Sequence, residues 1–164
     1  MRNANMVKVI SSLCVLAMIP GQYGCNLWRD RSLNGQVVEF HLAQVAPAPG
    51  LKLMDALVPD SGFYVESRPI VSDIDIASAR VERIPRGLVM HIRLTEDGAS
   101  RLTRVTHDHI GSRLALVVNG RLVVAPLIIE SANVLSDRSF SFAVDMPAAS
   151  VEQTMAAVAA RWKE

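Results

Sequence analysis

Aromatic residues make up only 5% of this 164-residue chain, yet half of its residues are apolar. That composition fits one modest domain with a hydrophobic core and excludes a disordered chain. An excess of either charge is also missing, because 17 Lys and Arg residues stand against 16 Asp and Glu residues. Neither the basic nor the acidic residues form a long cluster in the sequence. Binding to a phosphate backbone requires such a cluster of basic residues, which argues against a nucleic-acid partner.

Motifs that carry enzymatic chemistry are missing as well. The sequence contains no nucleophile elbow of a Ser-His-Asp enzyme, no phosphate-binding loop, no paired cysteines and no glycine-rich turn leading a helix. We therefore expect no enzymatic activity, no cofactor and no bound metal. Asp73 and Asp75 could form a carboxylate pair on a strand, but their position after Ser72 favours a helix start.

Apolar runs long enough to span a bilayer, about 20 residues, are not found. The run Val9–Ile19 follows two basic residues and stops at Pro20, which is the pattern of a secretory signal peptide. We expect residues 1–24 to be that signal, residues 25–36 to be a polar tether, and residues 37–164 to be the folded domain.

Cysteine occurs only twice, as Cys14 inside that apolar run and Cys25 just beyond it. Cleavage between them would leave one thiol in an exported protein, and a leftover cysteine needs an explanation. Gly24-Cys25 stands where bacterial lipoproteins carry the cysteine that becomes the acylated N-terminus. We expect lipidation of Cys25 on the periplasmic side of a membrane. Gln22 and Tyr23 differ from the residues that usually precede the lipidated cysteine. Two alternatives therefore remain: a periplasmic protein whose signal is cleaved without lipidation, and a protein anchored by an uncleaved signal.

Alternation of apolar and polar residues predicts most of the strands. The clearest case is Leu88–Leu94, and Asn119-Gly120 between two apolar runs is a strong hairpin signal. Both strands of that hairpin are apolar on both faces. We therefore expect the second face to be covered either by the N-terminal strand region or by a partner protein. The predicted strands are 37–42, 63–69, 79–84, 88–94, 113–118, 121–126 and 139–144, and short helices are expected at 51–58 and 73–79.

Two longer amphipathic helices are predicted. The first is capped by Thr95 and runs to about Ile110, with a buried stripe of Leu102, Val105, Thr106 and His109. The second begins with the capping box Ser150-Val-Glu-Gln153 and has a stripe of Val151, Met155, Val158 and Trp162.

The four histidines are not expected to form a metal site. Residues two apart on a helix are separated by roughly 200° in projection, so His107 and His109 cannot close on one ion. We expect His107 and the nearby Arg101 and Arg104 to be solvated, and His109 to lie partly buried on the packing face. His41 and His91 are predicted to lie on the solvent-exposed faces of their strands.

The stretch from Gly98 to Pro126 contains a pattern of small, apolar and turn residues, namely Gly98, Ala99, Thr106, Gly111, Leu114, Ala115, Asn119, Gly120, Ala125 and Pro126. This pattern resembles the head subdomain of the first periplasmic domain of SecD, the export-motor subunit. Asn119 stands where that family usually has an aspartate, and Ser112-Arg113 stands where a lysine is expected. The likeness spans about Val37–Trp162 and departs from the family pattern after Pro126.

Mostly antiparallel strands and two amphipathic helices suggest an α+β fold with both helices on one face of the sheet. The resemblance implies a ferredoxin-like arrangement and a non-enzymatic binding module of the cell envelope that contacts exported polypeptides or the export machinery. One physical route is strand addition at an open sheet edge. A lipoprotein that docks onto an envelope complex through the apolar hairpin face stays open, as does, more remotely, an envelope hydrolase with a deep polar pocket.

Overall fold

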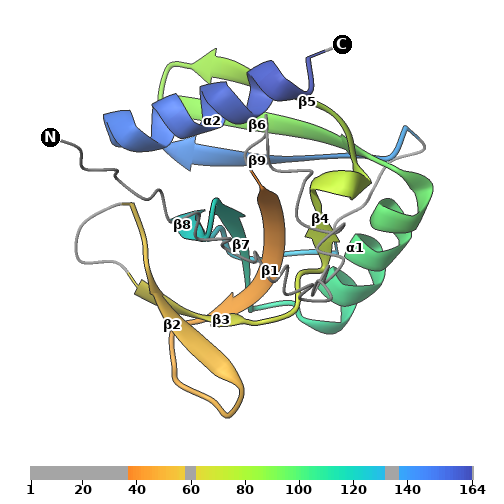
Figure 1. Cartoon of the computed structure of the whole chain (residues 1–164), viewed down its shortest axis with the longest axis vertical. Coiled ribbons are helices and arrows are strands. Elements are labelled where there is room, and N and C mark those ends of the chain that lie inside the picture. Colours follow the sequence, from red (N-terminus) through yellow and green to blue (C-terminus); the bar gives the residue numbers. More distant parts are fainter. Residues whose placement is uncertain (1–36, 58–61, 132–136, 164) are drawn as a thin grey trace, which may run out of the picture. The chain divides into compact units, whose positions relative to one another are not determined.

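The computed structural model describes residues 37–57, 62–131 and 137–163 (Figure 1). The expected signal peptide, the tether and Cys25 lie outside these residues. Within the described ranges, no helix has the length and hydropathy needed to cross a membrane.

The larger of two sheets is built from strands that are far apart in the sequence. Its members are β1 (Val38–Gln44), β2 (Leu51–Asp55), β3 (Gly62–Glu66), β4 (Val71–Ser72), β7 (Arg113–Val118) and β8 (Arg121–Val124). The strand order is β2-β3-β1-β7-β8, with β4 paired to β1, and these pairs are antiparallel. Ala56 forms a bridge with Leu122, and the N–H of Leu57 donates to the carbonyl of Leu122 at 2.9 Å. The two ends of the strand order therefore meet, and the sheet curls on itself.

The smaller sheet has the order β5-β6-β9, formed by β5 (Ile76–Ile84), β6 (Gly87–Leu94) and β9 (Ser139–Asp145). The alternation predicted for its central strand is confirmed, because Leu88, Met90, Ile92 and Leu94 are at most 3% exposed. Helix α2 (Ala149–Arg161) packs along this sheet, and α1 (Glu96–Asp108) lies beside β4 (Figure 1).

One main core joins the two sheets and both helices. It takes residues from one face of each sheet and from the buried sides of α1 and α2. Phe40 of β1 packs edge-on against Phe140 and Phe142 of β9, with ring centroids 5.4 and 6.3 Å apart. Aromatic contact therefore links the larger sheet directly to the smaller one.

The hairpin predicted around Asn119-Gly120 is confirmed. Asn119 has a φ of 51° and Gly120 a φ of 73°, the left-handed conformations that a two-residue turn of this kind requires. The second apolar face of β7 and β8 forms a smaller core that Met54, Ala56 and Phe63 cover. The cover therefore comes from the N-terminal strand region, one of the two expected sources.

The first long helix starts as predicted and ends slightly earlier. The Thr95 side chain accepts a hydrogen bond from the Gly98 N–H at 3.3 Å, and the helix ends at Asp108 instead of Ile110. Gly111 then adopts a φ of 89°.

The second long helix does not begin at the predicted capping box. Ala148 is the cap residue and makes no side-chain hydrogen bond, while Ser150 lies inside the helix. The predicted stripe is confirmed at Val151, Met155 and Val158, which are fully buried. Packing of this stripe, more than a cap, fixes the helix.

The short helix expected at 51–58 is wrong, because residues 51–55 form strand β2. Leu53 lies opposite Tyr64 of β3, and this long-range pairing overrides the local signal. The helix expected at 73–79 is a single 3-10 turn over Asp73–Asp75, after which β5 begins. The predicted class, α+β with antiparallel strands and two amphipathic helices, is confirmed, and the strands divide between two sheets.

Candidate functional site

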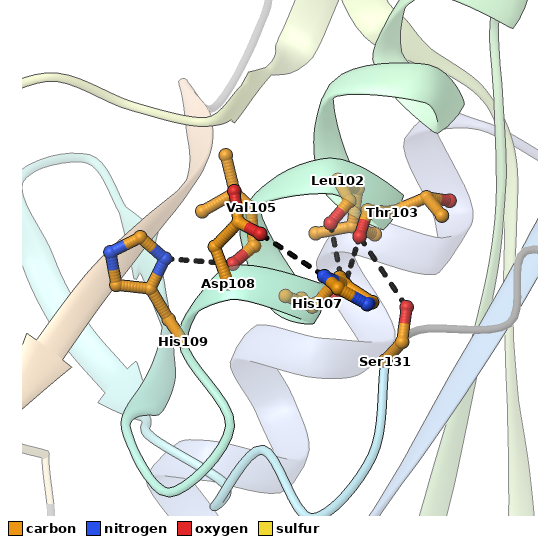
Figure 2. Close-up of polar contacts among 8 residues, drawn as sticks. Leu102, Thr103, Val105, His107, Asp108, His109 and Ser131 are labelled. Atoms are coloured by element: carbon orange, nitrogen blue, oxygen red, sulfur yellow. Dashed lines mark hydrogen bonds and ion pairs between the residues drawn. The ribbon is translucent and has the colours of Figure 1, made fainter.

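His107 and His109 lie at the end of α1 and extend in different directions (Figure 2). Nδ1 of His107 lies 3.0 Å from Oδ1 of Asp108, whereas Nδ1 of His109 lies 2.8 Å from the carbonyl oxygen of Val105. Both rings are exposed, so the expected burial of His109 is wrong. The helix ends one residue before His109, which removes this side chain from the packing face.

His41 is buried, at 6% exposure, so its predicted position on a wet face is wrong. Its Nδ1 lies 2.8 Å from the carbonyl oxygen of Glu66, and its Nε2 lies 3.3 Å from the carboxylate of Glu39. The pairing of β3 with β1 supplies that carbonyl, which the local alternation could not reveal.

His91 lies in the other sheet, so the two strand histidines do not meet. Its Nδ1 contacts the Ser141 hydroxyl at 2.7 Å and its Nε2 contacts a Glu82 carboxylate oxygen at 3.3 Å. These three side chains form a surface hydrogen-bond network on the outer face of the smaller sheet.

The two edges of the smaller sheet are β5 and β9. The N–H of Leu94 donates to the carbonyl of Arg138 at 3.0 Å, in line with the antiparallel β6–β9 register. Hydrogen-bonded pairs alternate along an antiparallel ladder, so every second residue from Arg138 points its N–H and C=O toward β6. The backbone groups of Ser141 and Ala143, in between, point away from β6.

The β5 edge is partly occupied, whereas the β9 edge pairs on one side only. The N–H of Ala79 on β5 donates to the carbonyl of Trp162 at the end of α2, at 3.1 Å. In the described part of the chain, the strand partner of β9 is β6 alone. An open row of main-chain donors and acceptors is a template for another strand.

A cavity of ≈ 580 Å³ lies beside this open edge, and we call it the β9 groove. Residues 139–143 of β9 form one wall and residues 126–131 form the other. Thr106 and Leu114 also line it and are only 1% and 7% exposed. Among these lining residues, Glu130 is the one with a charged side chain.

Hydrogen bonds fix the second wall of the β9 groove. The N–H of Ile128 donates to Ser112, and its carbonyl accepts from Gly111, each at 2.8 Å. The Ser131 hydroxyl lies 3.4 Å from the carbonyl oxygen of Thr103 in α1 (Figure 2). On either side of Ile128 the wall presents apolar side chains to solvent, since Leu127 is 50% exposed and Ile129 is 77% exposed. The groove therefore combines open backbone groups with an apolar lining.

A second feature, missed from the sequence, is an ion pair between Asp75 and Arg101. Nη2 of Arg101 lies 2.6 Å from Oδ1 of Asp75, and its Nε donates to the carbonyl of Ile70 at 3.1 Å. Ser72 donates to the other carboxylate oxygen through its N–H at 3.0 Å and its hydroxyl at 3.2 Å. Arg101 lies on the exposed side of α1, as predicted, but its guanidinium is paired with a carboxylate, which the sequence did not reveal. The predicted helix start at Asp73–Asp75 is confirmed as a 3-10 turn.

Replacing Asp75 with asparagine is expected to lower the free energy of unfolding at neutral pH by about 1–3 kcal/mol. Burial raises the pKa of the Asp75 carboxyl, but hydrogen bonds from Arg101 and Ser72 and the charge of Arg101 bring this pKa below its usual value. A depressed pKa stabilises the fold above about pH 4, and that stabilisation is lost as pH falls through the folded-state pKa.

Chemical denaturation of wild type and Asp75→Asn at several pH values tests this prediction. The difference between the two proteins should shrink on acidification below about pH 4. Asp73→Asn is the control, because the Asp73 carboxylate makes only a longer contact of 3.4 Å to Arg161. A difference that stays constant with pH would contradict the assignment.

The ten motif positions occupy turns and buried sites. Asn119, Gly120 and Gly111 have positive φ, and a Cβ on Gly98 would lie 2.8 Å from the Cβ of Asp75. Ala99, Thr106, Leu114, Ala115 and Ala125 are buried. Pro126 stands in the wall of the β9 groove.

The family model of the SecDF P1 head subdomain matches residues 52–156. The chain belongs to this family. The match extends beyond Pro126, the point at which the sequence pattern departs from the family.

Proteins similar to this chain include the protein translocase subunit SecDF of Thermus thermophilus. That protein is 37% identical over 62 residues, which cover 37% of this chain and 8% of the relative. A solved SecDF structure, described as a membrane component that enhances protein export, has a TM-score of 0.51 at 22% identity, covering 87% of this chain and 70% of its own. A crystal structure of SecDF from Thermus thermophilus has a TM-score of 0.52 at 20% identity, and the match covers 79% of this chain and 20% of the SecDF chain. These structures share the fold of the P1 head.

Proposed function

We propose that this chain is a non-enzymatic binding module of the cell envelope that contacts exported polypeptides at the β9 groove. Membership in the P1 head family makes it a protein-export-related module. The chain spans only 8% of the length of the curated SecDF relative. Support for a polypeptide client and for its binding surface comes from the groove itself.

The open edge of β9 is the observation that supports this proposal most strongly. The outward N–H and C=O groups of Ser141 and Ala143 can pair with any extended chain, because main-chain hydrogen bonds do not depend on side-chain identity. An export module meets many different sequences in an extended state, and strand addition provides contact of that kind.

The alternative, docking onto an envelope complex through the apolar hairpin face, lacks a free surface in the described residues. Val117 is 3% exposed and belongs to the smaller core that β2 and β3 cover. A charge at Val117 would therefore destabilise the fold instead of reporting on docking. Polypeptide contact at the β9 groove is the function favoured by the accessible surface.

Attachment of the module to a membrane through an acylated Cys25 is part of the proposal. Gly24-Cys25 after the apolar run Val9–Ile19 supports it. Intact mass and membrane fractionation of wild type and Cys25→Ser, expressed in a bacterial host, test it. We expect acyl mass and membrane association to be lost together in the variant. An unmodified soluble wild-type protein would remove the anchor from the account.

Replacing Ile129 with aspartate is expected to weaken binding of an unfolded polypeptide by about tenfold, or about 1.4 kcal/mol. Ile129 is 77% exposed in the groove wall, so the substitution places a charge in the binding surface without disturbing the core. Fluorescence anisotropy with a labelled, reduced and alkylated polypeptide measures the affinity of the full chain.

Val45→Asp is the matched control, because Val45 is 67% exposed and does not line the groove. It should bind like wild type. If wild type, Ile129→Asp and Val45→Asp bound with equal affinity, the binding site would lie outside the β9 groove. Absence of binding to the wild type would overturn the proposed function.

A further inference from the structure

We infer that the β9 groove selects extended segments in which apolar and polar residues alternate. This inference rests on the proposed function and names the class of polypeptide that the groove takes. It follows from the two faces of the smaller sheet, which a strand added to β9 would continue.

The two faces of β9 differ in chemistry. Phe140 is 9% exposed and belongs to the main core, and Phe142 is partly buried and packs against that core. Ser139, Ser141 and Ala143 alternate with them and face outward. Side chains of neighbouring strands lie side by side on the same face of a sheet. A strand added to β9 would therefore have one row of side chains beside the phenylalanines and the other row beside the serines.

The inward row of an added strand would enter the apolar part of the β9 groove. Leu114 lines it, and Leu127 and Ile129 are exposed in the opposite wall. Its volume of ≈ 580 Å³ lies within the range of about 300–1,000 Å³ that is typical of ligand sites. Burial of apolar side chains there is favourable by about 25 cal/mol per Å² of apolar surface, whereas an unpaired polar side chain would lose its water.

The outward row would stay in a polar setting. Ser141 on the edge strand hydrogen-bonds to His91 of β6, which also contacts Glu82 of β5, so the outer face of the smaller sheet is polar. Polar residues fit this side, because apolar ones would remain exposed to water. The outward backbone groups of Ser141 and Ala143 recur every second residue, a repeat that an extended strand matches and a helix does not.

Two synthetic peptides with the same length and amino-acid composition test the inference on the full chain. In the first, apolar and polar residues alternate strictly, and in the second the same residues follow a helical spacing of three and four. Anisotropy titrations at one ionic strength should give an affinity at least about tenfold higher for the alternating peptide. Two further peptides carry the alternating sequence with N-methyl groups on the backbone nitrogens of either all the apolar or all the polar residues. One of these two, the peptide whose methyl groups face β9, should lose this advantage.

The outcomes separate the inference from the proposed function. Equal affinity of the first two peptides would overturn the selection by pattern and leave polypeptide binding intact. Full affinity of both N-methylated peptides would also overturn it, because main-chain pairing would then not position the segment. If neither unmodified peptide bound, the proposed function would fail together with the inference.

Discussion

Replacing Phe40 with alanine is expected to lower the free energy of unfolding by about 3–5 kcal/mol. Phe40 is 1% exposed and packs against Phe140 and Phe142, so truncation opens a cavity at the junction of the two sheets. The surrounding elements come from separate parts of the chain and cannot collapse fully into the space. Urea denaturation followed by circular dichroism measures the change.

Phe63→Ala is the matched control for Phe40→Ala. Phe63 is only partly buried and belongs to the cover of the smaller core, where the Arg113 guanidinium lies 4.9 Å from its ring centre. Its truncation should cost clearly less, about 1–2 kcal/mol, because water already reaches part of the ring. Similar losses for the two variants would contradict the role of Phe40 as the link between the sheets.

Replacing Ala143 with proline is expected to reduce binding of an unfolded polypeptide by more than about tenfold while the domain stays folded. The Ala143 N–H points away from β6, so a proline removes a donor that no other strand in the described part of the chain uses. Proline is tolerated on edge strands at such positions, and its ring would block an approaching strand. Anisotropy measures the binding, and circular dichroism checks the fold.

Ala143→Val is the control for this prediction. Valine adds side-chain bulk at the same position but keeps the backbone N–H and favours an extended conformation. It should bind nearly as well as wild type. If the proline variant still bound the polypeptide, strand addition at β9 would be ruled out. If both variants lost the same affinity, the effect would be due to side-chain bulk.

Elements defined by local patterns could be predicted from the sequence. The alternation in Leu88–Leu94, the turn at Asn119-Gly120 and the cap at Thr95 each depend on neighbouring residues, and all three are confirmed. The local pattern of residues 51–58 predicts a helix, but the pairing of β2 with β3 decides the conformation of this segment. The same holds for His41, because the carbonyl that its ring contacts comes from β3.

The β9 groove could not be predicted, because its walls come from two separate segments and its open edge depends on sheet order. Nothing in the pattern of Ser139–Asp145 distinguishes an edge strand from a central one. The register with β6 is needed to decide which backbone groups point outward. The ion pair of Asp75 with Arg101 joins a 3-10 turn to α1 and likewise leaves no local signal.

Backbone hydrogen exchange at Ser141 and Ala143, followed by NMR on the full chain, tests the central claim most directly. These outward amides should exchange fast in the free protein and become protected when an unfolded polypeptide is added. The Phe142 amide, already directed at β6, should be slow in both states and serves as the internal control. Bound polypeptide without new protection at Ser141 and Ala143 would contradict binding by strand addition at the β9 groove.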